Sequence, residues 1–155
     1  LLALVRRAVG SAERVADLFS GAGTFSLPLA ENAEVFAAES AEGMLAALSA
    51  GARQANGLKP VKTQARDLFR RPLLPDELDR FDAVVLDPPR AGAEAQVREL
   101  TASRVPIVAY VSCNPVTFAR DAKILFDSGY KLDWLHVVDQ FRWSPHIELV
   151  AKIHR

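Results

Sequence analysis

The sequence predicts an α/β domain: a mostly parallel sheet with helices on both faces and an antiparallel last strand. Three observations lead to this prediction. Short apolar runs alternate with helical patterns along the chain, which is typical of parallel strands joined by helices. Polar side chains stand directly after several of these runs. The 155 residues are enough for one domain with a sizeable core.

The strands are predicted from apolar, β-branched runs bounded by turn residues. In order they are Val15–Phe19, Val35–Ala38, Val61–Ala65, Phe81–Leu86, Pro106–Val111, Lys131–Val138 and Ile147–Ile153. Helices are predicted where apolar residues recur every three or four positions, at Leu1–Val9, Phe25–Glu31, Met44–Ala55, Glu94–Ser103 and Val116–Phe126. The stretch Arg70–Asp79 has two prolines and no clear period, so we expect a loop there.

Composition excludes several classes of protein. The 19 basic and 19 acidic residues balance, so the domain is not a polycation. One cysteine cannot form an internal disulfide, and with three scattered histidines it offers no metal-ligand spacing. No apolar run could span a bilayer, and residues 1–9 lack the layout of a signal peptide. We expect a cytoplasmic monomer, and a fragment of a longer protein because the chain begins inside a helix.

Polar residues of chemical interest follow successive predicted strands. They are Asp17–Gly23, Glu39, Asp67, Asp87 and Cys113. The carboxyl ends of parallel strands share one edge of a sheet, where ligands bind. If the last strand is antiparallel, its beginning, with His146 and Glu148, reaches the same edge.

The segment from Asp17 to Phe25 is a strand, a glycine loop and a helix start. The loop lacks the third glycine of a dinucleotide fingerprint and the Lys-Ser/Thr of a P-loop. Glu39, about 20 residues further on, could accept hydrogen bonds from ribose hydroxyls, and Asp67 could hold an adenine amino group. An adenosine ligand without phosphates indicates S-adenosylmethionine. The candidate cofactor residues are Asp17, Phe19, Gly21, Gly23, Phe25, Glu39, Asp67 and Asp87. A structural turn with surface acids is the alternative.

Asp87 opens the segment Asp-Pro-Pro-Arg. Two prolines make a rigid turn that can hold Asp87 against a planar substrate. Enzymes that methylate exocyclic amines often have an aromatic residue where this chain has Arg90, which disfavours that reaction. The candidate substrate residues are Asp87, Pro88, Arg90 and Asn114. The alternative is a structural turn that ends a strand.

Cys113 follows a predicted strand and precedes Asn114 and Pro115, a good N-cap and a good first helical residue. A helix N-terminus favours the thiolate, which is the reactive form of cysteine. Glu148 is a candidate general base, because burial beside an apolar strand would raise the pKa of its carboxyl. The alternatives are a cysteine that packs as a small core residue and an ion-paired glutamate.

These segments resemble the S-adenosylmethionine-dependent RNA uracil-C5 methyltransferases, which make 5-methyluridine in tRNA and bacterial ribosomal RNA. The matching segments are 17–30, 87–92, 110–115, 117–121 and 146–148. The resemblance implies a Rossmann-like class I methyltransferase fold for the catalytic domain, 1–155. It also implies that Cys113 is the nucleophile, that Glu148 removes the C5 proton, that Gly21, Gly23 and Glu39 bind cofactor, and that Asp87 lies near the uracil.

The chain departs from the family in two ways. Ser20 stands where the family often has cysteine, at a position that is not catalytic. Full-length members also have N-terminal segments that bind RNA, some with an iron–sulfur cluster, and we expect residues 1–155 to contain none of these segments. The resulting hypothesis is methyl transfer to C5 of a uridine in RNA, with rRNA favoured over tRNA, through a covalent Cys–C6 adduct. An RNA cytosine-C5 methyltransferase and a cofactor-binding remnant without activity remain as alternatives.

Overall fold

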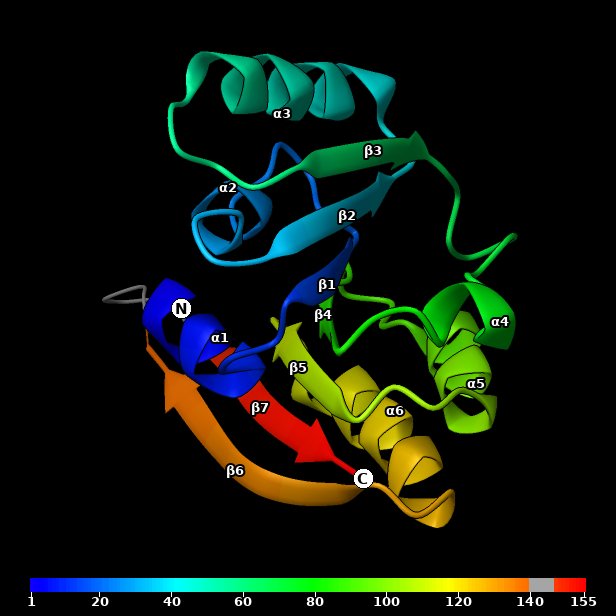
Figure 1. Ribbon diagram of the computed structural model, residues 1–155. Helices are drawn as coiled ribbons and strands as arrows, with labels where there is room; N and C mark the ends of the chain where they lie inside the picture. The colour runs from blue at the N-terminus through cyan, green and yellow to red at the C-terminus, as the bar shows by residue number, and fades with distance from the viewer. Residues whose placement is uncertain (140–146) are drawn as a thin grey trace.

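The computed structural model describes residues 1–139 and 147–155. One seven-stranded sheet has the order β3-β2-β1-β4-β5-β7-β6 (Figure 1). The strands are β1 (Arg14–Leu18), β2 (Glu34–Glu39), β3 (Val61–Ala65), β4 (Ala83–Leu86), β5 (Ile107–Ser112), β6 (Lys131–Val138) and β7 (Glu148–His154). Strands β1 to β5 pair in parallel, whereas β7 is antiparallel to both β5 and β6. The mostly parallel sheet with an antiparallel last strand is therefore confirmed.

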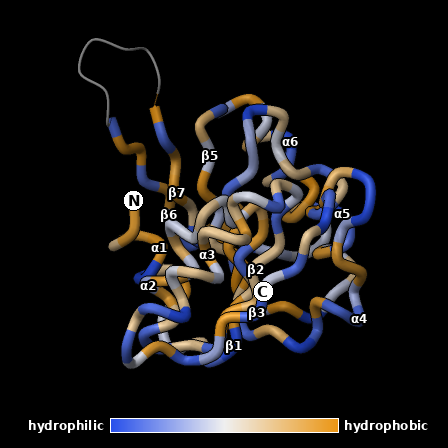
Figure 2. The backbone as a smooth tube through the Cα atoms, turned by 90° about the horizontal axis from the view of Figure 1, so that it is seen from above, coloured by the Kyte–Doolittle hydropathy of each residue, from blue (hydrophilic) through white to orange (hydrophobic). Residues whose placement is uncertain are grey.

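Helices cover both faces of the sheet (Figure 1). They are α1 (Leu2–Val9), α2 (Ser26–Leu29), α3 (Glu42–Gln54), α4 (Pro75–Leu78), α5 (Glu94–Ala102) and α6 (Pro115–Asp127). Residues of α1 to α3 pack in the core clusters on one face, and those of α4 to α6 pack in the cluster on the other. Figure 2 shows hydrophobic residues along the strands and hydrophilic residues in the connections near α4.

The prediction of a loop throughout Arg70–Asp79 is wrong, because this stretch contains α4. Pro75 occupies the first turn, where its missing N–H costs nothing. The Glu77 carboxylate accepts a hydrogen bond from the Leu74 N–H at 2.9 Å and pairs with Arg66 at 2.7 Å. A four-residue helix held by a distant arginine leaves no periodic pattern in the sequence.

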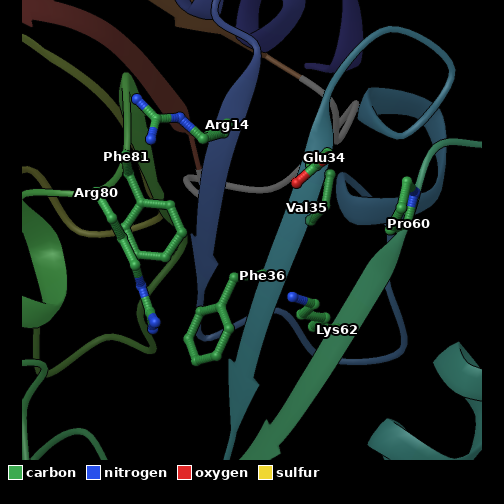
Figure 3. A pocket seen from close by; sticks show the side chains of 8 residues that line it. All are labelled: Arg14, Glu34, Val35, Phe36, Pro60, Lys62, Arg80 and Phe81. Carbon is green, nitrogen blue, oxygen red and sulfur yellow. The ribbon is translucent and has the colours of Figure 1, made fainter.

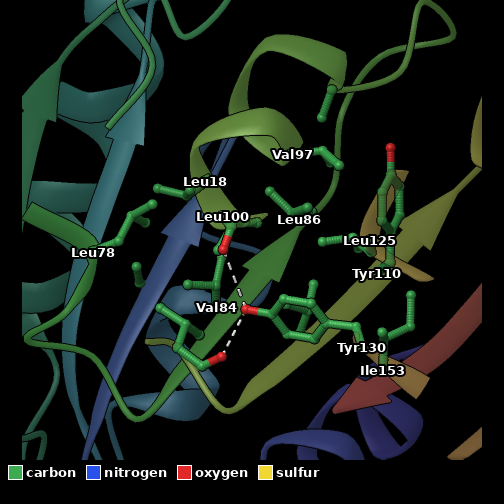
Figure 4. Close-up of a cluster of buried hydrophobic side chains, with 14 of the residues drawn as sticks. Leu18, Leu78, Val84, Leu86, Val97, Leu100, Tyr110, Leu125, Tyr130 and Ile153 are labelled. Atoms are coloured by element: carbon green, nitrogen blue, oxygen red, sulfur yellow. Dashed lines mark hydrogen bonds between the residues drawn. The ribbon is translucent and has the colours of Figure 1, made fainter. Parts of the chain in front are cut away.

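The larger core cluster lies between the sheet and helices α5 and α6 (Figure 4). Leu86, Leu100 and Leu125 are fully buried there. The Tyr130 hydroxyl also enters this core and donates hydrogen bonds to the carbonyls of Val105 at 2.7 Å and Leu100 at 3.4 Å. Its polar atom is thus satisfied where water is excluded.

The strand register determines which residues meet at the functional edge. The carboxyl ends of β1 to β5 lie together, and β7 begins there because it runs in the opposite direction. Ser112 at the end of β5 pairs with Leu149 at the start of β7. Cys113 and Glu148 therefore lie at the same end of adjacent strands, although 35 positions separate them in the chain.

Candidate cofactor and substrate site

The glycine loop after β1 has an unusual backbone. Phe19, Gly21 and Gly23 all have positive φ, at 64°, 54° and 94°. A Cβ at Gly23 would lie 2.4 Å from Cδ1 of Leu48, so glycine is needed here for space as well as for conformation. The Gly21 N–H donates a hydrogen bond to the Glu39 carboxylate at 3.2 Å. The loop is therefore packed against α3 and joined to the end of β2.

Asp17 lies buried beneath this loop rather than on its surface. One carboxyl oxygen accepts a hydrogen bond from the Ser26 hydroxyl at 2.5 Å. The other, Oδ1, has no partner within the described part of the chain. Burial raises the pKa of Asp17 to about 7, and the negative charges of Asp87 and Glu39 act in the same direction. An unsatisfied buried oxygen is costly, so a donor from a ligand would be favourable here.

Glu39 ends β2 with its carboxylate already oriented. It accepts hydrogen bonds from the Ala41 N–H at 2.9 Å, from the Ser40 hydroxyl at 3.0 Å and from Gly21. Burial alone would raise the pKa of Glu39, but these hydrogen bonds outweigh burial and lower it. The carboxylate is thus ionised and held rigidly, which suits an acceptor for a pair of hydroxyls.

Two exposed apolar side chains lie beside the glycine loop. Phe69 is 47% exposed, and its ring centroid is 5.3 Å from that of Phe19. Met44 is 50% exposed, and its sulfur is 3.8 Å from the position a Cβ would take at Gly21. Asp67 accepts hydrogen bonds from the N–H groups of Phe69 and Arg70, so it shapes the turn that presents Phe69.

Phe25 lies elsewhere. Its side chain is only 3% exposed and packs in the core cluster that includes Val15 and Leu29. The predicted site residue is thus adjacent to the loop in sequence, but its ring belongs to the interior of the domain.

The proline turn is joined to the helix that follows Cys113. The Arg90 carbonyl accepts hydrogen bonds from the Asn114 side-chain amide at 2.9 Å and from the Thr117 hydroxyl at 3.1 Å. Asn114 also accepts a hydrogen bond from the Val116 N–H, which confirms the predicted N-cap of α6. Cys113 is a free, partly exposed thiol at this junction.

Pro88 is buried at the start of the turn, whereas the Arg90 side chain is exposed. Asp87 is partly buried, and its N–H donates a hydrogen bond to the Leu18 carbonyl at 3.3 Å, which joins the end of β4 to the end of β1. The turn thus has a buried, anchored beginning and an open tip.

A buried carboxylate forms the second connection between the turn and α6. Asp121 is fully buried and accepts hydrogen bonds from the Tyr110 hydroxyl at 2.5 Å, the Ala93 N–H at 2.6 Å and Arg120 Nε at 2.8 Å. Burial and the hydrogen bond to Asp121 raise the pKa of Tyr110. A Cβ at Gly92 would lie 2.7 Å from the Asp121 carboxylate. The turn therefore approaches α6 too closely for any larger residue.

Asp87 and Glu148 lie at the same edge as Cys113. Burial, together with the negative charge of Glu148, raises the pKa of Asp87 to about 6. Burial also raises the pKa of Glu148, as the sequence predicts. His146, predicted to stand beside Glu148, lies outside the described residues. Both groups therefore hold a proton up to a higher pH than an exposed carboxyl does.

A comparison with known protein families decides the identity of the chain. Residues 4–155 match the model of the tRNA (uracil-5-)-methyltransferase family. The chain belongs to this family. The chain is also similar to an uncharacterized RNA methyltransferase of Brucella suis. The two are 54% identical over 151 residues, which are 97% of this chain and 36% of that protein.

Two further relatives have more specific names. A 23S rRNA (uracil(1939)-C(5))-methyltransferase of Hahella chejuensis is 42% identical over 90% of this chain and 32% of its own length. The crystal structure of Pyrococcus abyssi tRNA (uracil-54, C5)-methyltransferase, in complex with S-adenosyl-L-homocysteine, superimposes with a TM-score of 0.82 at 34% identity. That match covers 97% of this chain and 37% of the other. This uracil-5-methyltransferase family chain thus has the Rossmann-like methyltransferase fold and spans about a third of the relatives it matches.

Sequence reasoning missed three parts of the site in this family member. Phe69 and Met44 flank the glycine loop, and Asp121 holds the proline turn. Asp121 does leave a signal, because it is an acid on the same helical face as the apolar residues Phe118, Ala122 and Leu125. The described residues contain no group of three or more possible metal ligands. They also contain no helix long and apolar enough to cross a membrane.

Proposed function

We propose that this chain is the catalytic domain of an S-adenosylmethionine-dependent enzyme that methylates C5 of a uridine in RNA, acting as a monomer. The observation that carries this proposal is the meeting of Cys113 and Glu148 at the ends of paired strands, with Asp87 beside Glu148. A nucleophile and a proton acceptor on one sheet edge are what C5 methylation of uracil requires.

The residues present fit the cofactor. Glu39 is an ionised acceptor for ribose hydroxyls, and the exposed side chains of Phe69 and Met44 offer apolar walls for an adenine ring. The unpartnered Oδ1 of Asp17 would be satisfied by an ammonium group that reaches it through the glycine loop. When bound, S-adenosylmethionine supplies an electrophilic methyl group on a sulfonium.

Cys113 would begin the reaction. Its thiolate adds to C6 of the uracil, forming a C–S bond and leaving the electron pair as an enolate that makes C5 nucleophilic. After C5 takes the methyl group, Glu148 removes the C5 proton, and the electron pair of that C–H bond restores the ring double bond as the C–S bond breaks. The raised pKa of Glu148 makes its carboxylate a stronger proton acceptor than that of an exposed glutamate. The target base must leave its stack to reach this edge.

We also propose that the substrate is rRNA rather than tRNA. The Hahella relative, named for 23S rRNA, is 42% identical, against 34% for the tRNA enzyme of Pyrococcus. An RNA cytosine-C5 methyltransferase is disfavoured, because its proline turn usually carries a second cysteine and this chain has only Cys113.

The test is methylation by the full-length protein of rRNA and tRNA from cells that lack the enzyme, with 5-methyluridine measured by mass spectrometry. Cys113→Ala should abolish the product, and Glu148→Gln should trap an RNA–protein adduct that survives a denaturing gel. Glu13→Gln, an exposed acid at the opposite edge, is the matched control and should behave as wild type. Normal turnover by Cys113→Ala would refute the mechanism. Binding of S-adenosylhomocysteine without methyl transfer to any RNA would instead identify a cofactor-binding remnant.

A further inference from the structure

A hollow of about 270 Å³ lies at the edge of the sheet opposite the proposed catalytic edge (Figure 3). Arg14 and Glu34 line it and begin strands β1 and β2, whereas the proposed catalytic edge is at the other ends of these strands. Strands of five or six residues at about 3.3 Å each separate the two places by roughly 17–20 Å. The hollow is therefore not part of the site described above.

The hollow is open because one face of the sheet is incompletely covered. Phe36 of β2 pairs in register with Lys62 of β3, so the two side chains share a face. This is the face on which α4, α5 and α6 pack, and α4 is only four residues long and lies against α5. Phe36 is consequently only partly buried, and Lys62 is exposed.

Aromatic rings and cations alternate in the hollow. The Arg80 guanidinium lies 5.2 Å from the ring centroid of Phe36 and 5.0 Å from that of Phe81. Figure 3 shows Arg80 and Phe81 on one side of the hollow, with Phe36 and Lys62 across from them. Neither Arg80 nor Lys62 forms an ion pair among the residues that the structure describes. Both side chains are exposed, so a ligand can reach their charges, although the Glu77 carboxylate acts electrostatically on Arg80.

The positive charge continues along the edge strand. Pro60 also lines a neighbouring hollow that includes Arg53 and Lys59, and these two cations likewise have no ion-pair partner within residues 1–139 and 147–155. We call Arg53, Lys59, Lys62 and Arg80 the basic strip. Opposing charge is limited: Asp82 neutralises Arg14 through a 3.0 Å contact, and Glu34 is the acid that lines the hollow beside Phe36. Four cations without an ion pair among the described residues thus lie together at one edge of a chain whose total charge is balanced.

We infer that the basic strip and the Phe36 ring bind single-stranded RNA that flanks the target uridine. Unpaired cations attract phosphates, and the accessible part of the partly buried Phe36 ring, beside a guanidinium, is a stacking platform for a base. Cys113 also lies three strands away from β2, so the sideways offset of roughly 14 Å adds to the 17–20 Å along the strands and the path is at least about six or seven stacked nucleotides at about 3.4 Å each. The identity of the RNA as substrate rests on the proposed function, whereas the binding surface itself does not.

The test uses the full-length protein and a fluorescein-labelled single-stranded RNA of about 20 nucleotides. The dissociation constant is measured by fluorescence polarisation between about 50 and 200 mM KCl, because contacts with phosphates weaken strongly over this range. Lys62→Ala should weaken binding roughly threefold and reduce the slope of log K against log salt by about 0.7. Arg80→Ala should weaken binding about five- to tenfold, because a stacking partner is lost as well as a charge.

Lys62→Glu is the decisive variant, because this side chain is exposed and its replacement leaves the core intact. It should weaken binding more than Lys62→Ala does. The matched controls are Arg98→Ala on α5 and Lys123→Ala on α6, both exposed cations that already pair with an acid on their own helix. They should leave both affinity and salt slope unchanged.

The outcomes separate this inference from the proposed function. If Lys62→Glu binds RNA with the affinity and salt slope of the controls, the inference is wrong, even if uridine methylation is intact. If the strip variants lose affinity while no RNA is methylated by the wild type, the surface is supported and the proposed function fails.

Discussion

Replacement of Asp121 by alanine should destabilise the domain more than any exposed substitution on α6. Asp121 is fully buried and accepts hydrogen bonds from the Tyr110 hydroxyl and the Ala93 N–H. In Asp121→Ala both donors would remain buried without an acceptor. Arg120, whose side chain is 41% exposed, can turn to water and contributes less.

The size of the effect follows from these contacts. Each buried donor left unsatisfied costs about 1–3 kcal/mol, so we expect a loss of roughly 3–5 kcal/mol in the free energy of unfolding. Tyr110→Phe removes one of the stranded donors. The double variant should therefore lose about 1–2 kcal/mol less than the sum of the two single variants.

The assay is urea denaturation of the 155-residue chain, followed by circular dichroism. The matched control is Asp127→Ala on the same helix, which removes a carboxylate that is 64% exposed and paired with Lys123. It should cost no more than about 0.5 kcal/mol. If Asp121→Ala costs as little as this control, Asp121 does not clamp the proline turn and the reasoning is refuted.

Three further predictions concern the glycine loop, Asp17 and the cap of α6. Gly23→Ala should lower stability by more than about 1 kcal/mol and weaken S-adenosylhomocysteine binding in calorimetry, because the added carbon collides with Leu48. The control is Gly57→Ala, which has a similar φ of 78° but open space around it and should show the backbone strain alone. Equal losses of stability in the two variants would argue against the collision. Burial raises the pKa of Asp17 to about 7, above its ordinary 3.8, so the folded state binds the carboxyl proton more tightly than the unfolded chain does. The contribution of Asp17 to the free energy of unfolding is therefore lost as the pH rises from about 4 to about 7. Urea denaturation at several pH values should therefore show Asp17→Asn gaining on wild type by up to about 4 kcal/mol over that range, and a constant difference would contradict the assignment. Asn114→Ala should cost about 1 kcal/mol in the same assay through the lost cap, with Ser128→Ala at the other end of α6 as the comparison, and no loss would mean that the cap is replaced by water.

The strands and their common edge could be predicted because apolar runs of period two and the residues that follow them are local features. The sequence does not determine the direction of β7. It shows only that Glu148 would reach the common edge if β7 were antiparallel to the other strands and would not reach it otherwise. The helix α4 was not predictable, because it depends on the pairing of Glu77 with Arg66. Such pairs are made by the fold and leave no periodic signal.

The site residues divide in the same way. Glu39 and Cys113 could be found because each stands at the end of a recognisable strand. The direction of the Phe25 ring, which packs into the core, depends on where α2 lies against the sheet and not on the loop motif. The exposure of the Phe69 ring could not be predicted, because a single apolar residue in a turn gives no sign of whether its side chain faces the core or the solvent.

The position of β7 has a consequence for how the molecule is assembled. It follows every other strand in the sequence, yet it lies between β5 and β6. Until it pairs, both neighbours expose a row of unpaired backbone groups, which makes the unfinished sheet prone to aggregation. Glu148 is the first residue of this strand. A molecule in which β7 has not yet paired therefore also lacks its proposed base. Under the proposed mechanism, such an incompletely folded chain could not release an RNA bound covalently to Cys113.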